Sequence, residues 1–66
     1  MPNITIEGPP TKDLDKKREF VKELTNAATK FYGTPPQAIS VVIKENLPEN
    51  VSVGGELVMD KSKPGN

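Results

Sequence analysis

The chain has 66 residues, and a domain of that length buries only about 60% of the surface that its unfolded chain exposes. It contains neither cysteine nor histidine, which excludes disulfides, thiolate metal sites and the commonest general base of enzymes. Nine basic and nine acidic residues give a formal net charge of zero, which argues against nucleic acid or an anionic membrane as the main partner.

Oligomerisation is the remaining route to a larger core. The N-terminal residues carry neither the basic region nor the apolar stretch of a signal peptide, and no long apolar span follows. We therefore expect a cytoplasmic protein that works as a homo-oligomer.

The first predicted element is a short strand over residues 3–7 (NITIE). Polar and apolar residues alternate there, with β-branched residues in the middle, and the glycine and two prolines that follow end the pattern. Pro2 directly precedes this strand.

An amphipathic helix follows the loop. Either Thr11 or Asp13 can cap its start, because each side-chain oxygen can accept a hydrogen bond from an unpaired backbone N–H. The helix should run for about five turns. We expect Gly33 to end it in the left-handed conformation, since two prolines follow closely and cannot continue it. The apolar positions at helical spacing are Leu14, Phe20, Val21, Leu24, Ala27, Ala28 and Phe31.

The second predicted strand covers residues 39–45 (ISVVIKE), with Ile39, Val41 and Ile43 on one face and Val42 on the other. A strand, a long helix and a second strand form a βαβ unit, whose right-handed crossover makes the strands parallel and places the helix on one face. The opposite face of the sheet would be bare, which is itself an argument for assembly.

The remaining chain should form a small C-terminal hairpin or an arm that reaches a neighbouring subunit. Residues 46–50 have turn chemistry, and residues 51–58 suggest short extended pieces around a glycine kink. Residues 60–66 (DKSKPGN) are polar and predict a flexible tail. The predicted fold class is therefore α+β, a single domain over residues 1–66 built from one βαβ unit with parallel strands plus this hairpin.

Pro2 is the most distinctive chemical candidate. If Met1 is removed, its nitrogen becomes a secondary amine, and α-amino groups titrate nearer neutrality than side-chain amines. Such an amine could act as a general base in a chain without histidine. With Met1 attached the nitrogen is a non-basic amide, and a proline at the second position, taken alone, is most simply the start of a strand.

The other polar groups have simpler interpretations. The basic stretch of residues 12–18 is balanced by acidic neighbours and lacks aromatic residues, which is typical of a solvated helix face. The paired glycines at positions 54 and 55 are too short for a phosphate loop. Surface solvation is the simplest role for the carboxylates Glu7, Glu45, Glu49 and Glu56.

Several features follow one another in a characteristic order along residues 2–58. Pro2 heads a strand, a helix ends near Gly33, a β-branched strand follows, and residues 53–57 read VGGEL. In this order the chain resembles the 4-oxalocrotonate tautomerase family. The resemblance implies βαβ subunits that form dimers, and a hexamer made as a trimer of dimers. It also implies an isomerase without metal or organic cofactor, which uses its N-terminal proline as general base on a small enol or oxo acid.

The resemblance carries over to individual residues only in part. Pro2 matches the catalytic proline. An arginine of the family near the helix start corresponds to Lys12, which can still pair with a substrate carboxylate as a point charge. A second arginine, donated by another subunit, corresponds to Ser40, and an aromatic ahead of the glycines corresponds to Val51. The candidate substrate-binding residues are therefore Lys12, Ser40 and Val51.

The loss of the strand arginine matters, because one such electrostatic contact can contribute a few kcal/mol, on the order of 3, to transition-state stabilisation. Ser40 offers a hydrogen bond but no charge. Either the substrate differs from the dicarboxylate of the parent enzyme, or Lys44 or Lys16 supplies the missing charge, or activity is low.

The leading hypothesis is a cofactor-free keto–enol tautomerase with Pro2 as base. The main alternative is a non-catalytic oligomeric binding or scaffold protein of the same fold, motivated by Ser40 and Val51. A relative that hydrates or dehalogenates unsaturated acids ranks lowest, since neither Glu7 nor Glu45 can be assigned to water activation.

Overall fold

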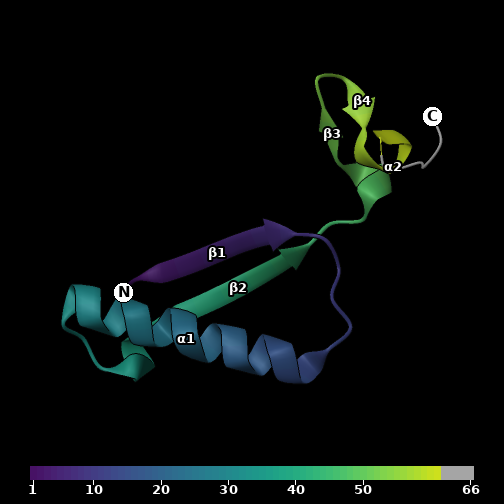
Figure 1. Cartoon of the computed structure of the whole chain (residues 1–66). Helices are drawn as coiled ribbons and strands as arrows, with labels where there is room; N and C mark the ends of the chain where they lie inside the picture. The colour runs from purple at the N-terminus through teal and green to yellow at the C-terminus, as the bar shows by residue number, and fades with distance from the viewer. Residues whose placement is uncertain (62–66) are drawn as a thin grey trace.

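Two parallel strands and one long helix form the body of the molecule (Figure 1). The computed structural model describes residues 1–61. Strand β1 (Asn3–Gly8) pairs in parallel with β2 (Ser40–Glu45), and helix α1 (Leu14–Tyr32) connects them. The register sets Asn3 opposite Ser40 and Gly8 opposite Glu45. The predicted βαβ unit is confirmed.

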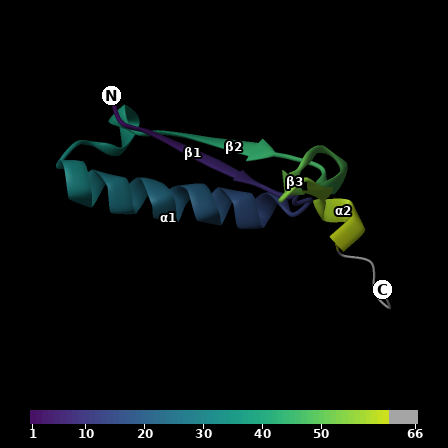
Figure 2. The same ribbon diagram turned by 90° about the horizontal axis from the view of Figure 1, so that it is seen from above.

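The sheet has one covered face and one open face. Figure 2 shows α1 running along one side of both strands. Ile4 and Ile6 of β1 are half-buried, as are Val41 and Ile43 of β2, whereas the residues between them are exposed. Because side chains alternate along a strand, these four form the apolar layer beneath the helix. Val42, on the open face, is 49% exposed.

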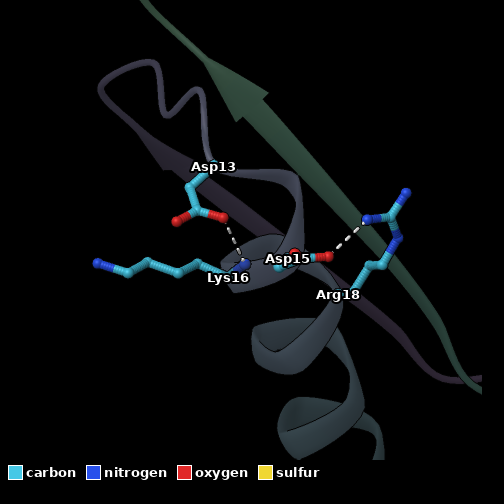
Figure 3. Close-up of polar contacts among 4 residues, drawn as sticks. All are labelled: Asp13, Asp15, Lys16 and Arg18. Carbon is cyan, nitrogen blue, oxygen red and sulfur yellow. Dashed lines mark hydrogen bonds and ion pairs between the residues drawn. The ribbon is translucent and has the colours of Figure 1, made fainter.

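Helix α1 begins and ends where its local chemistry predicts. Asp13 is the N-cap, and its Oδ1 accepts a hydrogen bond from the backbone N–H of Lys16 at 3.1 Å (Figure 3). Of the two predicted caps, Asp13 is therefore the one used. At the other end Gly33 has φ 70°, and its N–H donates to the Thr29 carbonyl at 2.8 Å. Only glycine adopts that conformation without appreciable strain.

A short 3-10 turn, η1 (Pro36–Ala38), leads into β2 and was not predicted. The N–H of Ile39 donates to the Pro36 carbonyl at 3.0 Å and closes the turn. Because that donor is used, the strand ladder begins at Ser40 rather than at Ile39, one residue later than predicted.

The C-terminal arm (residues 47–61) extends away from α1, beyond the carboxyl ends of β1 and β2 (Figure 1). It contains the 3-10 turn η2 (Pro48–Asn50), strands β3 (Ser52–Val53) and β4 (Glu56–Leu57), and the short helix α2 (Val58–Lys61). The strands are antiparallel, as the predicted hairpin requires. Gly54 and Gly55, with φ of 63° and 84°, have the positive φ at both central residues that a tight hairpin turn needs.

The predicted C-terminal tail needs correction at its start. Asp60 and Lys61 belong to α2 instead of to a tail, and residues 62–66 lie outside the described residues. The N–H of Val58, at the start of α2, donates to the Val51 carbonyl at 2.8 Å, so the helix folds back on η2. The polar composition of residues 60–66 did not reveal this contact, because it joins backbone groups of Val51 and Val58, which lie outside that stretch.

The isolated chain has almost no core. Ala28, at 7% exposure, is the only buried residue among residues 1–61. Large apolar side chains are exposed on the helix, the open sheet face and the arm, and they include Phe20, Phe31, Val42, Leu47, Val53 and Leu57. The shape is elongated, at 48 × 25 × 15 Å. Within residues 1–61 no helix is both long and apolar enough to cross a bilayer.

Candidate active site

Pro2 and Ser40 lie together at the amino end of the parallel sheet. The backbone N–H of Ser40 donates to the Pro2 carbonyl at 3.2 Å. The Ser40 hydroxyl donates to the side-chain oxygen of Asn3, its partner in the register. Pro2 is half-buried, whereas Met1 is 93% exposed, so packing within the chain does not depend on Met1. The Ser40–Asn3 pair is neutral and brings no charge to this end of the sheet.

Lys12 lies at the opposite end of the sheet, in the exposed loop between β1 and α1. Backbone contacts on both sides of Lys12 hold this loop. The Thr11 N–H donates to a carboxylate oxygen of Glu45 at 2.8 Å, and Asp13 caps α1. Lys12 is thus presented between two fixed neighbours.

Val51 also lies at the carboxyl end, beside a cavity where the body meets the C-terminal arm. This cavity has a volume of about 570 Å³, and it is lined by Glu7, Gly8, Pro9, Asn46, Pro48, Asn50, Val51, Ser52 and Val58. At its wall the Asn46 amide donates to a Glu7 carboxylate oxygen at 3.1 Å. The cavity therefore combines apolar walls with a carboxylate and an amide.

The four predicted residues do not meet within one chain. Pro2 and Ser40 are together, but the length of β1 separates them from Lys12 and Val51. At about 3.3 Å per residue, six steps along a strand span about 20 Å, more than a small acid can bridge. A site that uses all four residues must draw them from more than one copy of the chain.

Glu45 was predicted to be a solvated surface carboxylate, but it has two partners in the structure. Its carboxylate lies 2.6 Å from the Lys17 ammonium of α1 and also accepts the Thr11 N–H. The hydrogen bond from Lys17, and after it the one from Thr11, holds the pKa of Glu45 below its usual value. A sequence clue existed, because Glu45 continues the alternation of Val41 and Ile43 toward the helix. A carboxylate on an apolar face requires a partner.

Residues 1–61 contain no group of three or more acidic side chains that could hold a metal ion.

Comparisons with known proteins agree with this architecture. The sequence model of the tautomerase enzyme family matches residues 2–61. The structure of DmpI from Archaeoglobus fulgidus is 46% identical, with a TM-score of 0.80 over 89% of this chain and 100% of that one. TomN, a 4-oxalocrotonate tautomerase homologue of the tomaymycin biosynthetic pathway, is 30% identical, with a TM-score of 0.84 over 96% and 98% of the two chains. Another 4-oxalocrotonate tautomerase homologue is 28% identical, with a TM-score of 0.83 over 96% and 100%.

Proposed function

Because the chain belongs to the 4-oxalocrotonate tautomerase family, we propose that it is a keto–enol tautomerase in which Pro2, freed by removal of Met1, is the general base. The observation that carries the proposal is the place of Pro2, at the head of β1 in a chain that the family matches from that residue onward. Family membership supports an isomerase in general terms, and the roles of individual residues are our proposal.

The proposed reaction moves one proton within an enol or 2-oxo acid. The neutral amine of Pro2 takes a proton from the enol hydroxyl or from a carbon next to the carbonyl, and its ammonium form returns that proton at a conjugated position. Atoms and charge balance without a co-reactant, so substrate and product are isomers. As a secondary amine, the freed Pro2 nitrogen can accept a proton in its neutral form and return it as an ammonium group.

Substrate binding is assigned to the other end of the sheet in a second copy of the chain. Lys12 would pair with the substrate carboxylate, and Val51 would supply an apolar wall. Ser40 would offer a hydrogen bond to the substrate from another copy, as the family pattern implies for that position. The separation of the two ends by about 20 Å supports sharing of the site between copies. The exposed apolar side chains support assembly as well, and we propose a homohexamer, a trimer of dimers.

The decisive experiment compares ketonisation of 2-hydroxymuconate and phenylenolpyruvate by the wild type and Pro2→Ala. Intact-mass spectrometry first establishes that Met1 is absent. We expect Pro2→Ala to lose at least about 100-fold in kcat/KM, the usual contribution of general base catalysis. The control is a chain with an uncleaved N-terminal extension, which keeps the proline ring but turns its nitrogen into an amide. Equal rates for all three would refute Pro2 as the base.

A second candidate function is non-catalytic binding in an oligomer of the same fold. The neutral Ser40–Asn3 pair favours it, because Ser40 offers no positive charge where the family has an arginine. This alternative predicts an intact assembly without tautomerase activity on any simple enol acid. A robust rate that depends on Pro2 would eliminate it.

A further inference from the structure

We propose that Glu45, together with Lys17, is a positioning residue that fixes the β1–α1 loop and thereby the place of Lys12. The inference rests on the proposed role of Lys12 in binding a substrate carboxylate. In this proposal the position of Lys12 depends on Glu45 and Lys17, and neither of these two residues touches the substrate.

The Glu45 carboxylate joins parts of the chain that are remote in sequence. One oxygen of Glu45, at the end of β2, accepts the Thr11 N–H of the loop at 2.8 Å and lies 2.6 Å from the ammonium of Lys17 in α1. Thr11 immediately precedes Lys12, and Asp13, which immediately follows, is held as the N-cap of α1. The loop is therefore fixed on both sides of Lys12, once to the sheet and once to the helix.

The surroundings of this ion pair make it stronger than an ordinary surface pair. The Lys17 and Glu45 side chains are 27% and 30% exposed, and they border a cavity of about 280 Å³ whose walls include Ile6, Phe20 and Ile43. By contrast, the side chains of the Arg18–Asp15 pair on the same helix are 71% and 92% exposed (Figure 3). Water and salt screen such an exposed pair far more effectively.

Breaking the network should affect binding and leave the proton transfer intact. If Glu45 loses its charge, the Thr11 N–H and Lys17 keep only a neutral acceptor that binds them more weakly, and the loop samples positions in which Lys12 misses the substrate. The apparent affinity for the substrate falls in proportion to the fraction of molecules whose loop holds Lys12 in the binding position. The chemical step depends on Pro2, which lies at the opposite end of the sheet.

The test measures kcat and KM for phenylenolpyruvate with wild type, Glu45→Gln, Lys17→Met and the double variant, together with amide hydrogen exchange at Thr11. Circular dichroism and light scattering check folding and assembly, and Lys17→Met covers the case in which Glu45→Gln does not fold. Asp15→Asn is the matched control, because it removes a carboxylate from the exposed pair in the same region of α1.

We expect each single variant to raise KM about three- to tenfold and to keep kcat within about twofold of wild type. This corresponds to a fall, to about a third or a tenth, in the fraction of molecules whose loop is in the binding position. The double variant should be no worse than the worse single one, because both remove the same interaction. Exchange at Thr11 should accelerate in Glu45→Gln and remain unchanged in Asp15→Asn.

An unchanged KM, or additive effects in the double variant, would overturn the inference while leaving the role of Pro2 intact. Failure of the proposed function would show differently, as a wild type whose rate does not depend on Pro2. In that case amide hydrogen exchange still tests whether Glu45 holds the β1–α1 loop. Faster exchange at Thr11 in Glu45→Gln supports this role of Glu45, and unchanged exchange refutes it.

Discussion

At the scale of single residues, the chemistry of this chain depends on neighbours more than on residue type. Pro2 is a base only as a free amine, and Ser40 is neutral and bonded to Asn3. Glu45 differs from the other carboxylates because Lys17 and Thr11 both converge on it. Each of these properties has a measurable consequence.

A positive charge introduced at position 40 should change substrate preference. Ser40 is exposed and pairs with Asn3 at the edge of the open face, so Ser40→Arg has space to extend. We expect kcat/KM for the dicarboxylate 2-hydroxymuconate to rise about tenfold relative to the monocarboxylate phenylenolpyruvate, which corresponds to about 1.4 kcal/mol. Ser40→Gln, which is polar and uncharged but shorter, is the control. If both substrates respond equally to Ser40→Arg, the added charge does not act on the distal carboxylate.

The acid limb of the stability curve should depend on Glu45. Its pKa in the folded chain lies below that in the unfolded chain, so its stabilising contribution is complete above the unfolded value and is lost as pH falls through the folded value. Urea unfolding at pH 7 and at pH 3 should therefore show a smaller acid-induced loss in Glu45→Gln than in wild type. The same loss in both proteins would show that Glu45 does not contribute.

At the scale of elements, most of the fold followed from local pattern. Alternation predicted β1, helical spacing predicted α1, and the Asp13 and Gly33 caps lie where capping chemistry requires them. The turn η1 and the helix α2 were missed. A backbone hydrogen bond from Ile39 to Pro36 closes η1, and one from Val58 to Val51 holds the start of α2, and no side-chain pattern reveals either bond.

The C-cap of α1 should be sensitive to a single methyl group. Gly33→Ala places an alanine at φ 70°, and since the space around the added Cβ is open, the penalty is purely conformational. We expect a loss of about 1 kcal/mol in the free energy of unfolding. Gly8→Ala is the matched control, because Gly8 also has open space but no positive φ. Equal effects of the two substitutions in thermal or urea unfolding would rule out the left-handed cap as the cause.

At the scale of the whole molecule, the chain leaves most of its apolar side chains in contact with water. A body with one buried residue among residues 1–61 and a protruding arm obtains little stability alone. The proposed active site also requires more than one copy of the chain, because its two halves lie at opposite ends of the sheet. Assembly would meet both requirements at once.

Mixing two impaired variants should restore activity if the site is shared. Pro2→Ala lacks the base and Lys12→Ala lacks the carboxylate anchor, but a mixed assembly contains sites that take each intact residue from a different copy. After dissociation and joint reassembly, about a quarter of the sites in a random mixture should be fully intact. Light scattering should report a hexamer in each case. If mixing restores nothing while assembly is intact, both residues belong to the same chain's site.

The sequence by itself determined the strands, the long helix and its Gly33 C-cap, and the identity of Pro2 as a candidate base, because these depend on side-chain periodicity and on interactions within a few residues. Only the tertiary structure decided that Pro2 and Ser40 lie at one end of the sheet and Lys12 and Val51 at the other. It also decided that Glu45, which as a sequence letter was one surface carboxylate among several, ties the loop to the helix. The physical reason is the parallel pairing, since a register fixed by hydrogen bonds between distant segments sets which residues become neighbours.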